Sequence, residues 1–153
     1  MEKVWGFLHL FFAFSFVGSL VVAEWNGRAA RATADWAQRA LLFQIVMLSS
    51  RVAGVGGLVL LGVFGNMWSV PAGYRMATDL WPRLANGLWL ATVALMTFMV
   101  LPAASRLHRI AASGAAGGPT DGWDATLQRW RLGNVLLSLL YLGLLVLMVS
   151  HWR

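Results

Sequence analysis

The chain has 153 residues, of which 59% are hydrophobic and 12% are charged, and its mean hydropathy is +0.66. A water-soluble domain of this length does not hide so large an apolar fraction, so the composition favours an integral membrane protein. The absence of cysteine excludes disulfides, thiol catalysis and covalent c-type haem. The net charge of +6 comes mainly from arginines spread through short loops, a pattern that favours anionic lipid over nucleic acid as their partner.

Four apolar stretches follow one another along the chain, at residues 4–23, 41–64, 84–104 and 130–150. Each has the length of about 20 residues that a membrane-crossing helix needs. Glu24, Trp25 and Asn26 directly follow the first stretch, with no small-x-small cleavage site, so we interpret it as a retained helix and not a signal peptide. The sequence therefore predicts an all-α fold, an antiparallel four-helix membrane bundle that forms a single domain over residues 1–153.

The three connections differ in composition. The Ala-rich segment 28–38 has arginines at helical spacing and is predicted to continue the second helix. The segment Asn66–Arg83 is rich in Trp, Met and Pro, which predicts that it lies on the membrane surface and contacts other membrane subunits. The segment Ala111–Gly122 is rich in Gly, Ala and Ser, which is typical of a flexible loop, here a cytoplasmic one.

The positive charges predict the orientation of the bundle, because short loops rich in Arg and Lys remain in the cytoplasm. One side of the four stretches carries more of them than the other: Arg28, Arg31, Arg39, Arg106, Arg109, Arg129 and Arg131 against Lys3, Arg75, Arg83 and Arg153. Both termini are therefore expected on the periplasmic or outer side of a bacterial cytoplasmic membrane. Tryptophans gather near both predicted interfaces, as aromatic belts do.

Two histidines are the candidate cofactor ligands. His9 lies inside the first apolar stretch, where a histidine is costly and marks a ligand, a proton path or a polar contact. His151 ends the fourth stretch and is expected at the same membrane level. The pair is thus a candidate for the two axial ligands of a b-type haem, whereas His108 belongs to the opposite face. The alternative is that His151 is an interfacial side chain without a ligand.

The environment of His9 and the role of Arg51 both depend on which helix faces meet. Small residues opposite His9, such as Ser15, Gly18 and Ser19, predict that their face packs into the bundle and that His9 points toward a partner or cofactor. Arg51 interrupts the second stretch and needs neutralisation. Glu24 is the simplest predicted partner, and a haem propionate or lipid phosphate is the alternative.

Other side chains permit further interpretations. Met96 and Met99 share one helix face, and thioethers bind Cu(I), so a copper site is one interpretation. The alternative is that both side chains fill the core, as methionine ordinarily does. Asn86, Asn134 and Ser138 lie along helical stripes and are expected to make hydrogen bonds between helices. The many glycines after Arg51 are expected to allow close packing of a neighbouring helix.

Three stretches together resemble a known superfamily: Phe7-Leu8-His9 with Phe16-Val17-Gly18, Ser50-Arg51-Val52-Ala53 with Leu60-Leu61-Gly62, and Tyr74-Arg75. They are similar to the four-helix unit of the copper-resistance D membrane proteins, the related bacterial four-helix protoporphyrinogen oxidases, and an uncharacterised family of similar length. The oxidase branch implies that His9 is associated with haem. Asn86 stands near the place where that branch has a basic residue, which argues against porphyrinogen oxidation. The copper branch implies metal uptake.

No carboxylate pair, phosphate loop or nucleophile with an adjacent base is evident in the apolar stretches. The leading functional prediction is a small accessory subunit of a membrane redox complex that binds a b-type haem through His9 near the outer face. The alternatives are a structural subunit without a cofactor, and a protein that handles copper, haem or porphyrin.

Overall fold

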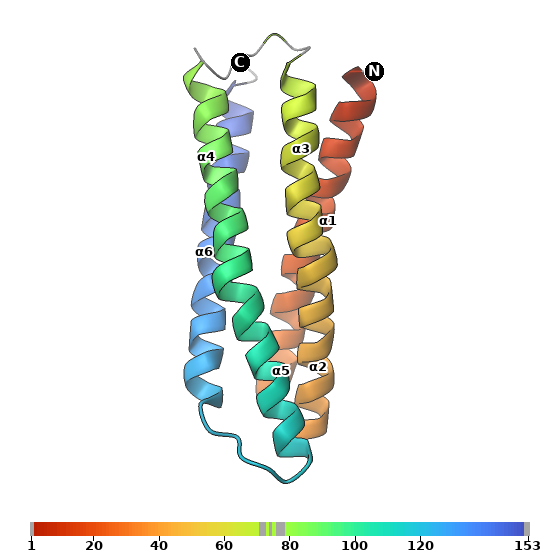
Figure 1. Cartoon of the computed structure of the whole chain (residues 1–153), viewed down its shortest axis with the longest axis vertical. Coiled ribbons are helices and arrows are strands. Elements are labelled where there is room, and N and C mark those ends of the chain that lie inside the picture. Colours follow the sequence, from red (N-terminus) through yellow and green to blue (C-terminus); the bar gives the residue numbers. More distant parts are fainter. Residues whose placement is uncertain (1, 71–72, 74, 76–78, 152–153) are drawn as a thin grey trace.

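The computed structural model describes residues 2–70, 73, 75 and 79–151, and these form four long helical rods without any strand (Figure 1). The first and last rods are single helices, and each of the middle rods is two helices joined through a π-helical segment. In chain order the elements are α1 (Glu2–Ala32), α2 (Trp36–Ser49), η1 (Ser50–Gly56), α3 (Gly57–Ser69), α4 (Leu80–Leu95), η2 (Met96–Val100), α5 (Leu101–Ala115) and α6 (Trp123–His151).

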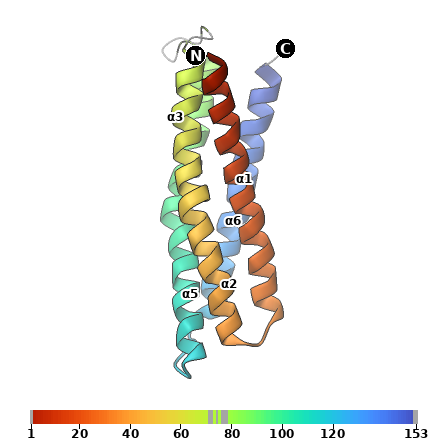
Figure 2. The same ribbon diagram turned by 90° about the vertical axis from the view of Figure 1, so that its right-hand side faces the viewer.

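Consecutive rods run antiparallel, so Glu2 of α1 and the end of α6 lie at one end of the bundle (Figure 1). We call this the termini end. The α1–α2 and α5–α6 connections lie at the other end, which we call the arginine end (Figure 2). All four rods are long and apolar enough to cross a membrane. The predicted all-α fold with four long apolar helices is therefore confirmed.

Both connections at the arginine end differ from the prediction. Residues 28–32 belong to α1 and not to the second rod, because a new helix begins after Asp35. The Asp35 carboxylate accepts a hydrogen bond of 2.9 Å from the backbone nitrogen of Ala37, which caps α2. On the other connection, α5 continues to Ala115, so the loop is shorter than the predicted segment 111–122.

The two π-helical segments have local causes in the sequence. Pro102 has no backbone N–H, and its ring conflicts with the carbonyl four residues earlier, so the helix widens in η2 just before it. The segment η1 holds Gly54 and Gly56, whose lack of a side chain gives the backbone more conformational freedom. The two segments lie close together, since a Cβ added to Gly54 would stand 2.3 Å from the Met96 Cε atom.

Close contacts of glycines fix how the rods are aligned along the bundle. Near the termini end, a Cβ on Gly65 would stand 2.9 Å from the Nδ1 atom of His9. In the middle, Gly54 lies beside both Met96 and Ser19, which we call the middle layer.

A further layer lies closer to the arginine end. The Trp130 ring lies over Gly27, where a Cβ would stand 2.4 Å from its Cη2 atom, and it packs edge-on against Phe43 at 5.4 Å. Gly27, Phe43 and Trp130 form what we call the arginine-end layer. Because these contacts join different rods, they set the relative depth of every residue along the bundle.

Candidate functional site

His9 lies in the contact between α1 and α3, with 6% of its surface exposed. Its Nδ1 atom donates a hydrogen bond of 2.9 Å to the carbonyl oxygen of Leu61. The imidazole fits against α3 because Gly65 has no side chain there, and the ring of Trp68 lies beside it with centroids 6.0 Å apart. This hydrogen bond fixes the proton on Nδ1, so Nε2 is the nitrogen with a free lone pair.

The buried face of α1 therefore differs from the predicted one. His9, Phe16, Ser19 and Ala23 are all buried and follow the three-and-four spacing of a helix face, whereas Gly18 is exposed. The expectation that His9 points away from the bundle was wrong, because the glycines of α3 make room for aromatic rings at the helix contact. The sequence signal for this arrangement was Gly65, which leaves room for the imidazole, whereas Gly62 leaves room for Trp89 of α4.

Arg51 is not part of the same site as His9. It stands exposed on the rod that also carries Gly65, fourteen residues away, which corresponds to roughly 20 Å along a helix. No described residue forms a hydrogen bond or ion pair with Arg51. His151 ends α6, but its side chain lies outside the described part of the chain. The structure thus leaves the predicted pairing of His9 with His151 as a prediction.

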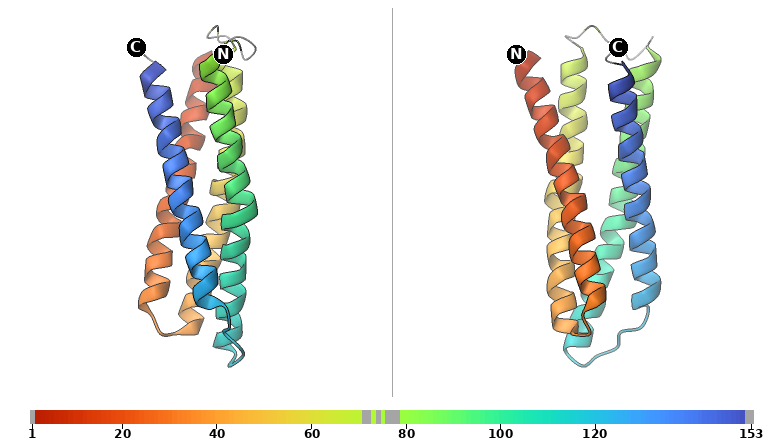
Figure 3. Two further views of the ribbon diagram at one scale, coloured as in Figure 1. Left: turned by 90° about the vertical axis from the view of Figure 1, so that its left-hand side faces the viewer. Right: turned by 180° about the vertical axis from the view of Figure 1, so that it is seen from behind.

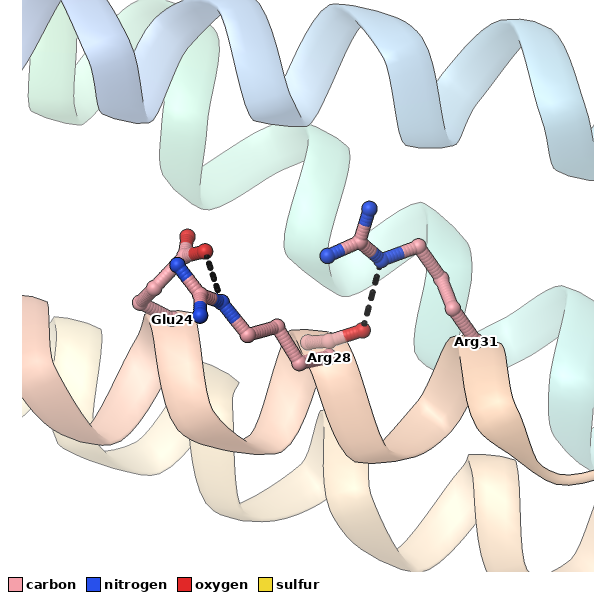
Figure 4. A network of polar contacts seen from close by, with 4 residues as sticks. Glu24, Arg28 and Arg31 are labelled. Carbon is pink, nitrogen blue, oxygen red and sulfur yellow. Dashed lines mark hydrogen bonds and ion pairs between the residues drawn. The ribbon is translucent and has the colours of Figure 1, made fainter.

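The predicted ion pair between Glu24 and Arg51 does not form. Glu24 instead accepts a hydrogen bond of 2.6 Å from the Nε atom of Arg28, one turn further along α1 (Figure 4). Residues four apart on a helix surface are neighbours, so this local partner competes successfully with a side chain on another rod.

The polar residues inside the bundle form two kinds of contact. Asn66 and Asn86 exchange hydrogen bonds of 2.9 and 3.2 Å between α3 and α4, as expected for a residue that joins helices. Asn134 and Ser138 instead donate to carbonyl oxygens of α6 itself, so the prediction of contacts between helices was wrong for them.

Tryptophans add contacts that the sequence did not indicate. The indole nitrogen of Trp89 donates to the carbonyl oxygen of Leu58 at 2.7 Å, and that of Trp81 donates to Leu147 at 3.0 Å. Each bond joins two rods. The bundle is thus held partly by indole N–H groups that donate to backbone carbonyl oxygens of neighbouring rods.

The remaining candidate ligands lie apart from His9. Met96 packs against Gly54 of η1, whereas Met99 packs against Gly133 of α6, so the two thioethers contact different rods. The Nδ1 atom of His108 lies 3.0 Å from the carbonyl oxygen of Ala40 near the arginine end. Among the described residues, no group of three or more His, Asp or Glu side chains is placed to hold a metal ion.

An open hollow of about 700 Å³ lies along α1, with Ser138 of α6 at its edge. Its walls include Val17, Leu20, Val21, Glu24, Arg28 and Ser138. In the right view of Figure 3, α1 and α6 lie on the same side of the bundle and are separated most widely at the termini end. No family model, curated protein or solved structure matches this chain, so the family resemblance stays a prediction.

Proposed function

We propose that the chain is a multi-pass membrane protein that crosses a bacterial cytoplasmic membrane four times and serves as a small accessory subunit of a larger membrane assembly. The rods carry uncharged stretches at residues 4–23, 52–69, 84–105 and 132–150. Each is about 20 residues long and matches a hydrocarbon layer of about 30 Å. The positive-inside rule then favours the arginine end in the cytoplasm and both chain termini outside.

The packing favours a different second span from residues 41–64. Ser19 lies near the arginine-end limit of the first uncharged stretch, and Gly54 lies beside it. Gly54 must then also lie near the limit of its own span, which favours a span that begins after Arg51. Arg51 then lies at the headgroup level, where an exposed arginine requires no protein partner.

One observation favours the subunit role most strongly. Leu41, Ile45 and Leu48 stand 58%, 41% and 61% exposed on the outer face of α2. Leu41 and Ile45 lie around the level of Phe43, which belongs to the arginine-end layer, and Leu48 lies between this layer and Arg51, so all three are placed beyond the proposed hydrocarbon layer. Neighbouring apolar side chains exposed outside the hydrocarbon layer are typical of a protein contact surface. We name Leu41, Ile45 and Leu48 the α2 strip.

Site-specific photo-crosslinking in native membranes tests this role. A photoreactive amino acid at Leu48 is expected to yield a discrete protein adduct. The matched control is Leu142 of α6, which is 56% exposed but lies within the proposed hydrocarbon layer, so it is expected to yield lipid adducts alone. Absence of any protein adduct from position 48, with the variant present at normal levels, would count against a subunit that docks through the α2 strip.

A second candidate function, binding of a b-type haem, is favoured by the hydrogen bond of His9. Histidines that bind metals commonly donate their other N–H group to a carbonyl oxygen, which orients the ring. The bond from Nδ1 to Leu61 gives His9 this form and leaves Nε2 without a bond to any described residue. The close fit of the ring against Gly65 and Trp68 supports the competing view that His9 only joins α1 to α3.

A reduced-minus-oxidised visible spectrum of the protein purified in mild detergent separates these two views. A sharp b-type signal that disappears in His9→Ala and persists in His108→Ala would support haem binding. A protein that retains its helical content but lacks the signal would leave His9 as a packing residue.

A further inference from the structure

The exposed apolar face of the second rod has the spacing of a coiled-coil seam. The α2 strip, formed by Leu41, Ile45 and Leu48, is followed at the next seam position by Val52 of η1, which is 67% exposed. The successive spacings are four, three and four residues, which is the heptad repeat that keeps one face of a helix toward a partner helix. Val59 stands one heptad after Val52 and is 39% exposed on α3, so this face remains outward beyond η1.

The residue types at these positions favour a pair of parallel helices. Ile45, Val52 and Val59 take the a positions of the heptad, and all three are β-branched. Leu41 and Leu48 take the d positions. Because β-branched residues at a with leucine at d favour two parallel strands, the face matches a second helix with the same sequence.

The rest of α2 is occupied by the chain's own core. Phe43, Val46 and Ser50 take the f and b positions, opposite the seam, and are buried in the bundle. Val55, at the next d position after Leu48, is partly buried against the same core. The open seam is therefore the segment from residue 41 to residue 52, roughly 16 Å of helix.

The polar side chains beside the seam are compatible with a symmetric pair. In a parallel pair, each g position lies beside the following e position of the partner helix. Gln44 and Arg51 take the g positions, and the following e positions are Ser49 and Gly56. A two-fold pair through this face thus opposes no like charges, which would otherwise destabilise the contact.

We propose that a second copy of this chain docks on the α2 strip, with the two α2 helices parallel and related by a two-fold axis along the membrane normal. The proposal rests on the subunit role and the membrane location proposed above, and it identifies the partner at the α2 strip. Both copies have the same orientation in the membrane, so identical residues meet at the same depth. Because the strip lies beyond the hydrocarbon layer, the contact removes its apolar side chains from water.

Disulfide formation between introduced cysteines tests which positions meet, because the natural chain has no cysteine. Leu48→Cys and, separately, Ile45→Cys are oxidised in native membranes, and each is expected to give a disulfide-linked dimer of this chain. The matched control is Leu132→Cys on α6. Leu132 is 54% exposed and lies two residues beyond Trp130 of the arginine-end layer, so it has a comparable depth without belonging to the seam. This variant is expected to remain monomeric.

A charge exchange at Ile45 tests whether this residue meets its own counterpart. Two copies with different affinity tags are co-expressed, and recovery of one with the other is measured after extraction in mild detergent. Ile45→Glu in both copies, or Ile45→Lys in both, is expected to lower recovery by roughly tenfold or more, because like charges then oppose each other across the seam. One Glu copy with one Lys copy is expected to restore recovery, which also shows that both variants fold. Leu132→Glu in both copies should leave recovery unchanged.

Several outcomes would overturn the proposal. Equal dimer yields from positions 48 and 132 would reflect random collisions, and no dimer from either position 45 or position 48 would show that the strips do not meet. Recovery that is independent of the charges at position 45 would show the same. A photo-adduct at Leu48 that contains only a different protein would refute the second copy and leave the subunit role intact. Absence of any protein adduct there would instead remove the subunit role itself.

Discussion

The contact between Gly62 and Trp89 makes Gly62→Ala the sharpest stability test of the helix alignment. Gly62 is buried in α3, and a Cβ at this position would stand 2.1 Å from the Cε2 atom of Trp89 and 2.5 Å from its Nε1 atom. The same Nε1 atom donates the 2.7 Å hydrogen bond to Leu58. The indole ring must therefore move, and the hydrogen bond between α4 and α3 is lost with it.

The expected loss follows from three contributions. Overpacking of a close contact costs roughly 1–3 kcal/mol. The lost hydrogen bond adds roughly 0.5–1.5 kcal/mol. The higher helix propensity of alanine stabilises the folded state by about 1 kcal/mol and offsets part of this loss. The net decrease in the free energy of unfolding is thus about 0.5–3.5 kcal/mol.

Gly87→Ala is the matched control, because Gly87 lies in α4 with no atom within 4 Å of an added Cβ. It receives the same gain in propensity without the collision and is expected to be neutral or slightly stabilised. Both variants are compared by denaturation in mixed detergent micelles, followed by tryptophan fluorescence. If Gly62→Ala were as stable as Gly87→Ala, the alignment of α3 against α4 described here would be incorrect.

Three other substitutions test separate contacts. Arg39→Ala should lower the unfolding free energy by about 1 kcal/mol, because its guanidinium stacks on Trp36 at 4.3 Å and on Trp123 at 5.1 Å; an unchanged melting temperature would show that the stacking contributes nothing. His9→Ala should lower it by about 1–3 kcal/mol through loss of a buried hydrogen bond and of ring packing, and a thermal melt in detergent that matches the unmodified protein would contradict this. Arg51→Gln should change it by less than about 0.5 kcal/mol, since the side chain is exposed, whereas a large loss in the same melt would reveal a partner.

The number and type of the helices were predictable because each rod contains a largely apolar run long enough to dominate any local preference. The helix ends were not, because the rods extend past their apolar runs. Residues 28–32 are alanine and arginine, and residues 111–115 are mainly alanine; these residues form helix readily but carry no membrane signal.

The surroundings of the candidate residues were less predictable because they depend on contacts between distant segments. A helical wheel of α1 offers an aromatic face with His9 and a small-residue face with Gly18, and the sequence of α1 alone does not choose between them. Gly65, more than fifty residues later, provides the space that selects the first. For Glu24, a partner one turn away was present in the sequence as Arg28, and the local pair formed.

Cysteine labelling tests the proposed membrane location most directly, because the natural chain has no cysteine. Leu142→Cys would place a thiol at a position that is 56% exposed in the protein alone, and Ala116→Cys would place one in the exposed α5–α6 connection. In intact membranes, a water-soluble maleimide is expected to leave position 142 unlabelled and to reach position 116 from the cytoplasmic side only. Rapid labelling of position 142 would show that water surrounds this face, and would contradict a bundle embedded in lipid.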